Sequence, residues 1–260
     1  MRCVLNRFLA GTCVLAFVLL GLGSAKAASD FKGFYVGANA GGAFGRFDVD
    51  TSPVFSPTGY FASTSTPAIT VASAQKIKPN GFTAGGQAGY NFQWDNFVFG
   101  LEWDFGKMDL SGATTVTQTY PCCAPTAFTV AQTVETSWVM TARPRVGFVF
   151  GHAMFYGTVG AAFTNVKYTA LFTDTFATAH ESASLDDKRA GWVAGGGTEL
   201  AITHHLSVKG EYLYAGFGTA TVTSNNLTAF SPPIAFPTNV FTHTVALHAR
   251  IARGGINFRF

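Results

Sequence analysis

Charged residues are scarce in this sequence. They make up 12% of its 260 residues, which is about half the share of an ordinary water-soluble domain. Long apolar runs are scarce as well, because no stretch of about 20 apolar residues after residue 27 could form a second membrane-spanning helix. Any role inside a membrane after export would therefore require a closed β-barrel.

The first 27 residues have the composition of a targeting segment. Arg2 and Arg7 supply positive charge, an apolar run extends from Phe8 to Gly23, and residues 25–27 have the form of an A-x-A cleavage site. We therefore predict a signal peptide over residues 1–27, removed on export. The alternatives are a membrane anchor, for which the apolar run is short, and a lipoprotein modified at Cys13, which lies too early in that run.

Basic residues are not in excess once this segment is removed. The whole chain has a net charge of +3, but three of its 17 basic residues lie in the segment, and the remaining 14 equal the 14 acidic residues. A nucleic-acid-binding protein needs a basic patch, so we expect no nucleic-acid partner.

A strict two-residue alternation between Phe82 and Gly106 is the clearest structural signal in the chain. Period two is typical of a strand with unlike faces. The turn at Asp95-Asn96 makes Trp94 and Phe97 partners, so that the apolar residues of both strands share one face. That face carries Phe82, Ala84, Tyr90, Phe92, Trp94, Phe97, Phe99, Leu101, Trp103 and Phe105, and the other carries Gln87, Asn91, Glu102 and Asp104.

The same alternation recurs along the chain and predicts eight strands of about ten residues. Short turns at residues 95–96, 151–152 and 203–205 alternate with long segments rich in Ser, Thr and Pro. We predict four long loops at about residues 46–80, 109–135, 168–189 and 216–240.

The short turns also predict a register. Phe148 should pair with Phe155, and Glu199 should lie directly opposite Lys209. Upstream of Ala252 the alternation of the last strand breaks, which indicates either a β-bulge or the end of the lipid-contact band.

The charged residues of the predicted strands all fall on one side. They are Glu102, Asp104, Arg143, Arg145, Glu199, Lys209, Glu211, Arg253 and Arg259. On the lipid side each Arg or Lys would cost roughly 2–4 kcal/mol at the midplane, and short turns alternating with long loops are typical of outer-membrane barrels. The predicted fold is all-β, an eight-stranded antiparallel up-and-down transmembrane β-barrel over residues 28–260. The alternative, a soluble exported β-sandwich, leaves the loop asymmetry unexplained.

Four stretches resemble a known family. They are Gly33–Asn39, Gly191–Glu199, Lys209–Tyr214 and Arg253–Phe260. Their sequences and order are similar to those of the small outer-membrane β-barrel proteins of alphaproteobacteria, which are related to opacity-type surface antigens and loosely to the OmpA transmembrane domain. The resemblance covers the chain after residue 27 apart from its loops, and the vicinal Cys122-Cys123 departs from the family pattern.

The resemblance implies a location and an assembly route. The barrel would be inserted into the outer membrane by the outer-membrane assembly machinery, and the terminal Phe260 would belong to the assembly signal. The implied roles are surface antigen, porin-like protein and envelope integrity. We expect no peptidoglycan-binding domain of the OmpA type.

The interior of an eight-stranded barrel is just wide enough for side chains to fill it. We therefore predict that the inward charges form a structural polar network and that the barrel does not conduct steadily. The network residues are Glu102, Asp104, Arg143, Arg145, Glu199, Lys209 and Glu211. The alternative is a narrow or gated path through the same residues, which would make the protein a small porin-like channel.

Cysteine and histidine indicate no catalytic or metal site. In an oxidising compartment Cys122 and Cys123 would form a vicinal disulfide, pair with another chain or stay idle, and the local sequence offers too few ligands for a metal. Catalysis of the triad kind needs a His held by a carboxylate, and neither His243 nor His248 has an acidic neighbour in sequence. We expect no cofactor and no catalysis.

The long loops carry the remaining candidates for specific function. Their polar, proline-bearing composition suits contact with other cells, phage or host molecules, and it suits passive shielding equally well. The best-supported reading is a monomeric outer-membrane protein with a structural or surface-contact role. Its expected partners are outer-membrane lipid, lipopolysaccharide and the assembly machinery.

Overall fold

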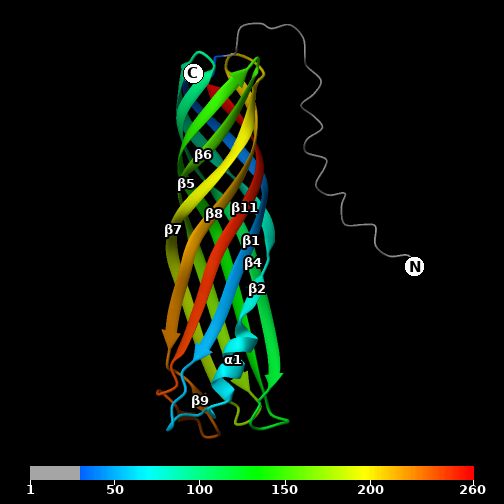
Figure 1. The fold of residues 1–260 in the computed structure, drawn as a ribbon, viewed down its shortest axis with the longest axis vertical. Coiled ribbons are helices and arrows are strands. Elements are labelled where there is room, and N and C mark those ends of the chain that lie inside the picture. The colour runs from blue at the N-terminus through cyan, green and yellow to red at the C-terminus, as the bar shows by residue number, and fades with distance from the viewer. Residues whose placement is uncertain (1–29) are drawn as a thin grey trace, which may run out of the picture.

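A computed structural model describes residues 30–260, which form one closed ring of antiparallel strands (Figure 1). The predicted signal peptide, residues 1–27, lies outside the described residues. The ring contains, in chain order, β1 (Gly33–Pro53), β3 (Asn80–Trp94), β4 (Phe97–Thr119), β5 (Ala127–Phe150), β6 (Ala153–Asp174), β7 (His180–Ala201), β8 (Leu206–Ser224) and β11 (Phe241–Arg259). Each strand pairs with the next, and β1 closes the ring by pairing with both β3 and β11. The predicted eight-stranded fold is confirmed.

The remaining elements lie in the half of the barrel away from the tight turns. The helix α1 (Ser65–Ser73) and the short strands β9 (Thr228–Ala229) and β10 (Ile234–Ala235) lie at its end, and β2 (Gln75–Ile77) lies part of the way along the wall, paired with residues 47–49 of β1. In Figure 1 α1 and β9 lie at the lower end, whereas the C-terminus lies at the opposite end beside the tight turns. No helix among residues 30–260 is long and apolar enough to cross a membrane. We call the end that carries α1 the loop end, and the other the turn end.

The tight turns set the register as the sequence predicts. Trp94 of β3 pairs with Phe97 of β4 across the first turn, and Phe148 of β5 pairs with Phe155 of β6 across the second. Glu199 of β7 lies opposite Lys209 of β8 across the third. The first two turns need a left-handed residue, which Asp and Gly tolerate best. Asp95 has φ of 50° and Gly151 has φ of 60°.

The predicted loop boundaries are wrong. The segments at about residues 109–135 and 168–189 belong largely to strands, and those at about residues 46–80 and 216–240 begin inside strands. The ring strands are joined at the loop end by residues 54–79, 120–126, 175–179 and 225–240. Residues 110–119 and 127–136, for example, form a continuous antiparallel ladder between β4 and β5. The barrel is therefore about twice as tall as the predicted ten-residue strands allow.

In the strand halves that were predicted to be loops, the polar side chains face outward and the apolar ones face inward, which explains the error. On β4 the outward residues are apolar from Phe97 to Phe105 and then polar from Lys107 to Thr119. The inward residues change in the opposite sense, from Glu102 to the fully buried Leu110. The apolar outer band matches the 9–11 residues of a membrane-spanning strand. Beyond it water replaces lipid outside the wall, so the strand continues with the pattern of a water-soluble sheet.

The break upstream of Ala252 has the same cause. The pairing of β1 with β11 runs without a register shift from Tyr35 opposite Arg259 to Pro53 opposite Phe241. Val245 and Ile251 still point inward, where they are buried, and Arg250 points outward. Of the two predicted explanations, the end of the lipid-contact band is confirmed. A register shift between β8 and β11 does lie in this stretch, between Ala246 and His248, but the odd-numbered residues of β11 stay buried on both sides of it.

The interior is built in layers along the barrel axis. A small apolar cluster at the turn end contains Phe31, Val98, Val149, Met154 and Tyr156. The charged residues of the strands come next, followed by a large apolar layer that includes Phe47, Met108, Leu110, Val134, Phe217 and Leu247. The loop end is filled by a second apolar cluster, which we call the plug and which includes Phe61, Ile69, Tyr120, Phe128, Phe172 and Phe241.

Candidate functional site

Eight charged side chains form a buried ionic layer in the half of the barrel nearer the turn end. They come from five strands and are no more than 6% exposed. The residues are Glu102 and Asp104 on β4, Arg143 and Arg145 on β5, Glu199 on β7, Lys209 and Glu211 on β8, and Arg253 on β11. The seven network residues that the sequence indicated thus lie together, and Arg253 joins them.

Arg143 lies at the centre of this layer. One of its terminal nitrogens, Nη2, donates to Glu102 Oε1 at 2.7 Å and to Asp104 Oδ2 at 2.8 Å, and Nη1 donates to Glu211 Oε2 at 3.0 Å. Its guanidinium therefore connects β5 to β4 on one side and to β8 across the barrel. Buried charges are tolerated only when they are paired and hydrogen-bonded in this way.

The other cations complete the network. Arg253 donates from Nε to Glu211 Oε1 at 2.6 Å and from Nη2 to Asp104 Oδ2 at 3.0 Å. Lys209 Nζ lies 2.9 Å from Glu102 Oε1. These contacts link β8 and β11 to β4, so the ion pairs cross the full width of the barrel.

Uncharged polar side chains extend the network toward the turn end, and they were not among the predicted network residues. Tyr35 donates its phenol hydrogen to Glu102 Oε2 at 2.8 Å, and Arg145 Nε donates to Asn91 Oδ1 at 2.9 Å. Gln87 donates to Asn257 at 2.7 Å. All four polar partners occupy inward positions of the two-residue alternation, which was the signal that could have identified them.

Apolar side chains border the ionic layer on both sides. On β4 the fully buried Val98 lies on the turn side, and the fully buried Met108 and Leu110 lie on the loop side. Ion pairs and hydrocarbon thus alternate along the barrel axis. Such an interior resembles a packed core more than an aqueous channel.

A second buried polar cluster lies nearer the loop end. His243 on β11 contacts Glu181 Oε1 on β7 through Nε2 at 3.3 Å and Thr51 Oγ1 on β1 through Nδ1 at 2.9 Å. A histidine between a carboxylate and a hydroxyl has the connectivity of a catalytic triad. The carboxylate is 62 residues away in sequence, so local reading could not find it. All three side chains are at most 1% exposed, which leaves a substrate no access.

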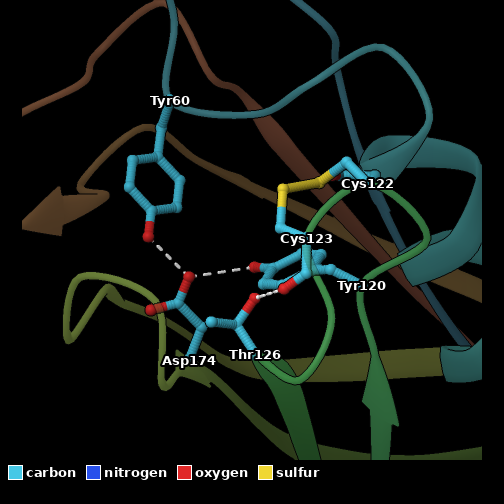
Figure 2. The surroundings of a disulfide bond; sticks show 7 residues. Tyr60, Tyr120, Cys122, Cys123, Thr126 and Asp174 are labelled. Atoms are coloured by element: carbon cyan, nitrogen blue, oxygen red, sulfur yellow. Dashed lines mark hydrogen bonds between the residues drawn. A yellow bond between two sulfur atoms is a disulfide. The ribbon is translucent and has the colours of Figure 1, made fainter.

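The plug carries the disulfide and a shared carboxylate (Figure 2). Cys122 and Cys123 are bonded to each other, as one of the sequence alternatives proposed. Beside them the phenols of Tyr60 and Tyr120 both donate to Asp174 Oδ2, at 2.5 Å and 3.0 Å. Within residues 30–260 no group of three or more His, Cys, Asp or Glu side chains could hold a metal ion.

Both phenols at this carboxylate are held in their neutral form. Burial raises the pKa of Tyr60 well above its usual range, and the Asp174 carboxylate adds to the shift. Burial likewise raises the pKa of Tyr120, again with a further contribution from Asp174. Because each phenol must keep its hydrogen to donate to the carboxylate, this cluster fastens the first connecting segment to β6 at neutral pH.

A closed eight-stranded ring with an apolar outer band and paired charges inside defines a transmembrane β-barrel. The chain matches the family model "Outer membrane protein beta-barrel domain" over residues 13–231. It belongs to this family and is a protein of the outer membrane. The family resemblance of the sequence motifs is therefore confirmed.

Similar proteins agree with this assignment. The chain is 29% identical over 232 residues to the 31 kDa outer-membrane immunogenic protein of Brucella melitensis, covering 88% of this chain and 84% of that protein. It is 31% identical over 145 residues to the 25 kDa outer-membrane immunogenic protein of Brucella abortus, covering 55% of each. These relatives bear the names of surface immunogens and not of enzymes.

The structure also resembles that of the outer membrane protease OmpT of Escherichia coli. The two share 7% sequence identity with a TM-score of 0.43, over 91% of this chain and 99% of that chain. A likeness of this size carries no functional argument for the present chain.

Proposed function

We propose that this protein is a closed, non-conducting barrel that contributes to the structure of the outer membrane and presents a rigid surface outside the cell. The observation that carries the proposal is the layered interior. From the turn side to the loop end, the ionic layer, the apolar layer and the plug fill successive levels of the barrel. A steady ion path would have to cross two levels of buried hydrocarbon, where an ion lacks hydration.

The tall outer half of the barrel supports the surface-contact role. Beyond the lipid band each wall continues as a hydrogen-bonded sheet with polar outward residues. At its tip the ring of Tyr60 lies 6.2 Å from those of Phe176 and Phe230 and 5.3 Å from that of Phe236. Phe176 is 55% exposed and Phe230 is 44% exposed. Exposed aromatic clusters on a rigid support are typical of contact surfaces.

Catalysis has no part in this proposal. The histidine with a triad-like environment, His243, is buried on the turn side of the plug, and a general base must reach its substrate. The protein would act as a monomer, with Phe260 serving in assembly by the outer-membrane machinery. Lipopolysaccharide and outer-leaflet lipid would be its membrane partners.

Planar-bilayer recording of the refolded, detergent-purified chain tests the closed barrel. We expect a flat current trace, with a general porin reconstituted in the same way as the positive control. Arg143→Ala should also stay closed, because the apolar layer and the plug remain. Stable, reproducible single-channel steps from the wild-type chain would contradict the proposal and favour the small porin-like channel instead.

A further inference from the structure

A hollow of about 480 Å³ opens on the outer wall where the apolar band ends on the loop side. Its floor and sides come from β1, β11, β8 and the segment leading into β3. The lining residues are Phe44, Gly45, Arg46, Asp48, Lys78, Asn80, Tyr214, His248 and Arg250. The hollow therefore lies at the boundary between the lipid-facing wall and the water-facing wall.

Strand pairing holds the cations of this hollow together. Arg46 is the β1 partner of His248, and Phe44 is the partner of Arg250. Lys78 is brought alongside by the hydrogen bond from the Gly45 amide to the Pro79 carbonyl, at 2.8 Å. Three cationic side chains from three segments thus face one space, with a single carboxylate, that of Asp48, among them.

The positive charge of the hollow is incompletely balanced. Arg46 lies 3.1 Å from Asp48, but among the described residues neither Lys78 nor Arg250 forms an ion pair with a carboxylate. Three other cations on the water-facing wall are each paired with a carboxylate, whereas within residues 30–260 the isolated Lys76 and Lys188 are not. Lys107 lies 2.9 Å from Asp109, Lys167 lies 3.6 Å from Asp186, and Arg189 lies 3.2 Å from Asp187. The hollow is therefore suited to an anionic group from outside the chain.

A track of small residues runs from the hollow into the lipid-facing wall. Ala40 on β1 pairs with Gly254 on β11 and with Ala84 on β3, and Gly42 pairs with Ala252. All five face outward, between the bulky side chains of Phe44 and Ile256. Many lipid-facing positions of this barrel carry Phe, Trp, Leu or Val, whereas this track beside the hollow carries only Ala and Gly, which leave room for an acyl chain to lie against the backbone.

We propose that this hollow binds the phosphate of an acylated, phosphorylated lipid of the outer leaflet. Arg46, Lys78 and Arg250 would receive the phosphate, and an acyl chain would lie over Gly42 and Gly254. A free anion would contact only the cations, whereas a lipid would contact both the cations and the small-residue track, which adjoin each other on β1 and β11. Basic groups beside a membrane surface bind anionic headgroups in this manner. The inference rests on the proposed orientation, with the loop end outside the cell.

Native mass spectrometry of the full refolded chain in dodecyl maltoside, titrated with purified lipid A, tests the proposal. The triple variant Arg46→Gln, Lys78→Gln and Arg250→Gln should bind lipid A on the order of 100-fold more weakly than the wild type. The matched control removes the three paired cations, through Lys107→Gln, Lys167→Gln and Arg189→Gln, and should bind within about twofold of the wild type. Equal losses in the two variants would overturn the proposal.

A second pair of variants distinguishes a lipid from a free anion. Gly254→Leu places a bulky side chain on the small-residue track and leaves the cations in place. The barrel can accept it, because the nearest atom to an added Cβ is the Lys209 carbonyl oxygen at 3.7 Å. It should weaken lipid A binding. Gly157→Leu on β6 adds the same side chain to another outward position with open space and should not. If dephosphorylated lipid A binds as well as lipid A, or inorganic phosphate binds as tightly as lipid A does, the lipid-phosphate site is wrong.

Heat-modifiable gel mobility reports whether each variant is folded. If the triple charge variant fails to fold, the two Leu variants still test the proposal. The bilayer recording is independent of the binding assay. If the wild-type barrel both binds lipid A and conducts ions, the proposed lipid site stands and only the proposed non-conducting barrel is contradicted.

Discussion

Arg143 and Glu102 face each other across neighbouring strands, with Nη2 of the arginine 2.7 Å from Oε1 of the glutamate. The pairing follows directly from the β4–β5 register, which places both side chains on the inner face. The same guanidinium also contacts Asp104 and Glu211. One cation therefore neutralises carboxylates on two strands among side chains that are almost fully buried.

Arg143→Met should destabilise the barrel strongly. Removing one partner of a buried ion network leaves carboxylates uncompensated, and such losses amount to about 3–5 kcal/mol. Urea unfolding in lipid vesicles, followed by gel mobility with and without boiling, measures the change. Lys107→Met on β4 is the matched control, because its ion pair with Asp109 is exposed and is worth at most about 1 kcal/mol. Similar losses in the two variants would show that the ionic layer is unimportant for stability.

The stability cost of a charged residue on the outer face of β4 should depend on its position along the barrel axis. Leu101→Arg introduces a cation in the middle of the apolar band and should cost roughly 2–4 kcal/mol of unfolding free energy. Thr115→Arg, outward on the same strand but on the water-facing half, should cost little, since surface substitutions stay within about 0.5 kcal/mol. Unfolding in vesicles measures both. A large cost at Thr115 would mean that lipid reaches higher than the polarity change on β4.

The tyrosines of the plug should give a pH-dependent stability. Because the folded pKa values of Tyr60 and Tyr120 are raised, their contribution is present below the unfolded value of about 10 and is lost as the pH rises above it. The double variant Tyr60→Phe and Tyr120→Phe should therefore show a shallower fall in urea midpoint between about pH 9 and pH 11.

Asp174→Asn provides the matched control for that experiment. Burial is the larger cause of both shifts, so replacing the carboxylate with an amide should preserve most of the pH dependence. Tyrosine absorbance near the alkaline end of the titration provides a second readout. Ionisation of both phenols at about pH 10, as in an unfolded chain, would contradict the prediction.

The two cysteines should be resistant to alkylation. Cys122 and Cys123 are bonded to each other, so iodoacetamide without reductant should add no mass to the exported chain, and two additions should appear after reduction. Cys122→Ser is the control and should accept one addition without reductant. A disulfide-linked dimer on a non-reducing gel would show that the cysteines pair between chains.

Much of the turn-end half of the barrel could be predicted from the chain. The alternation between Phe82 and Gly106 determined which residues face lipid, and the short turns determined pairs such as Glu199 with Lys209. The loop-end half was misread because its polar outward residues and proline-bearing stretches have the composition of loops. Its inward residues, such as Val134 and Phe172, keep the same period of two. Composition alone does not distinguish a loop from a strand with water on one side.

The sequence by itself determined the two faces of each strand, because successive side chains of an extended chain point in opposite directions whatever surrounds them. The tertiary structure decided what each face meets. Closing the ring brought Arg253 to Asp104, 149 residues away, and Glu181 to His243, 62 residues away. It also stacked the ionic layer, the apolar layer and the plug along one axis. These contacts depend on where eight strands lie around a common interior, and no single segment contains that information.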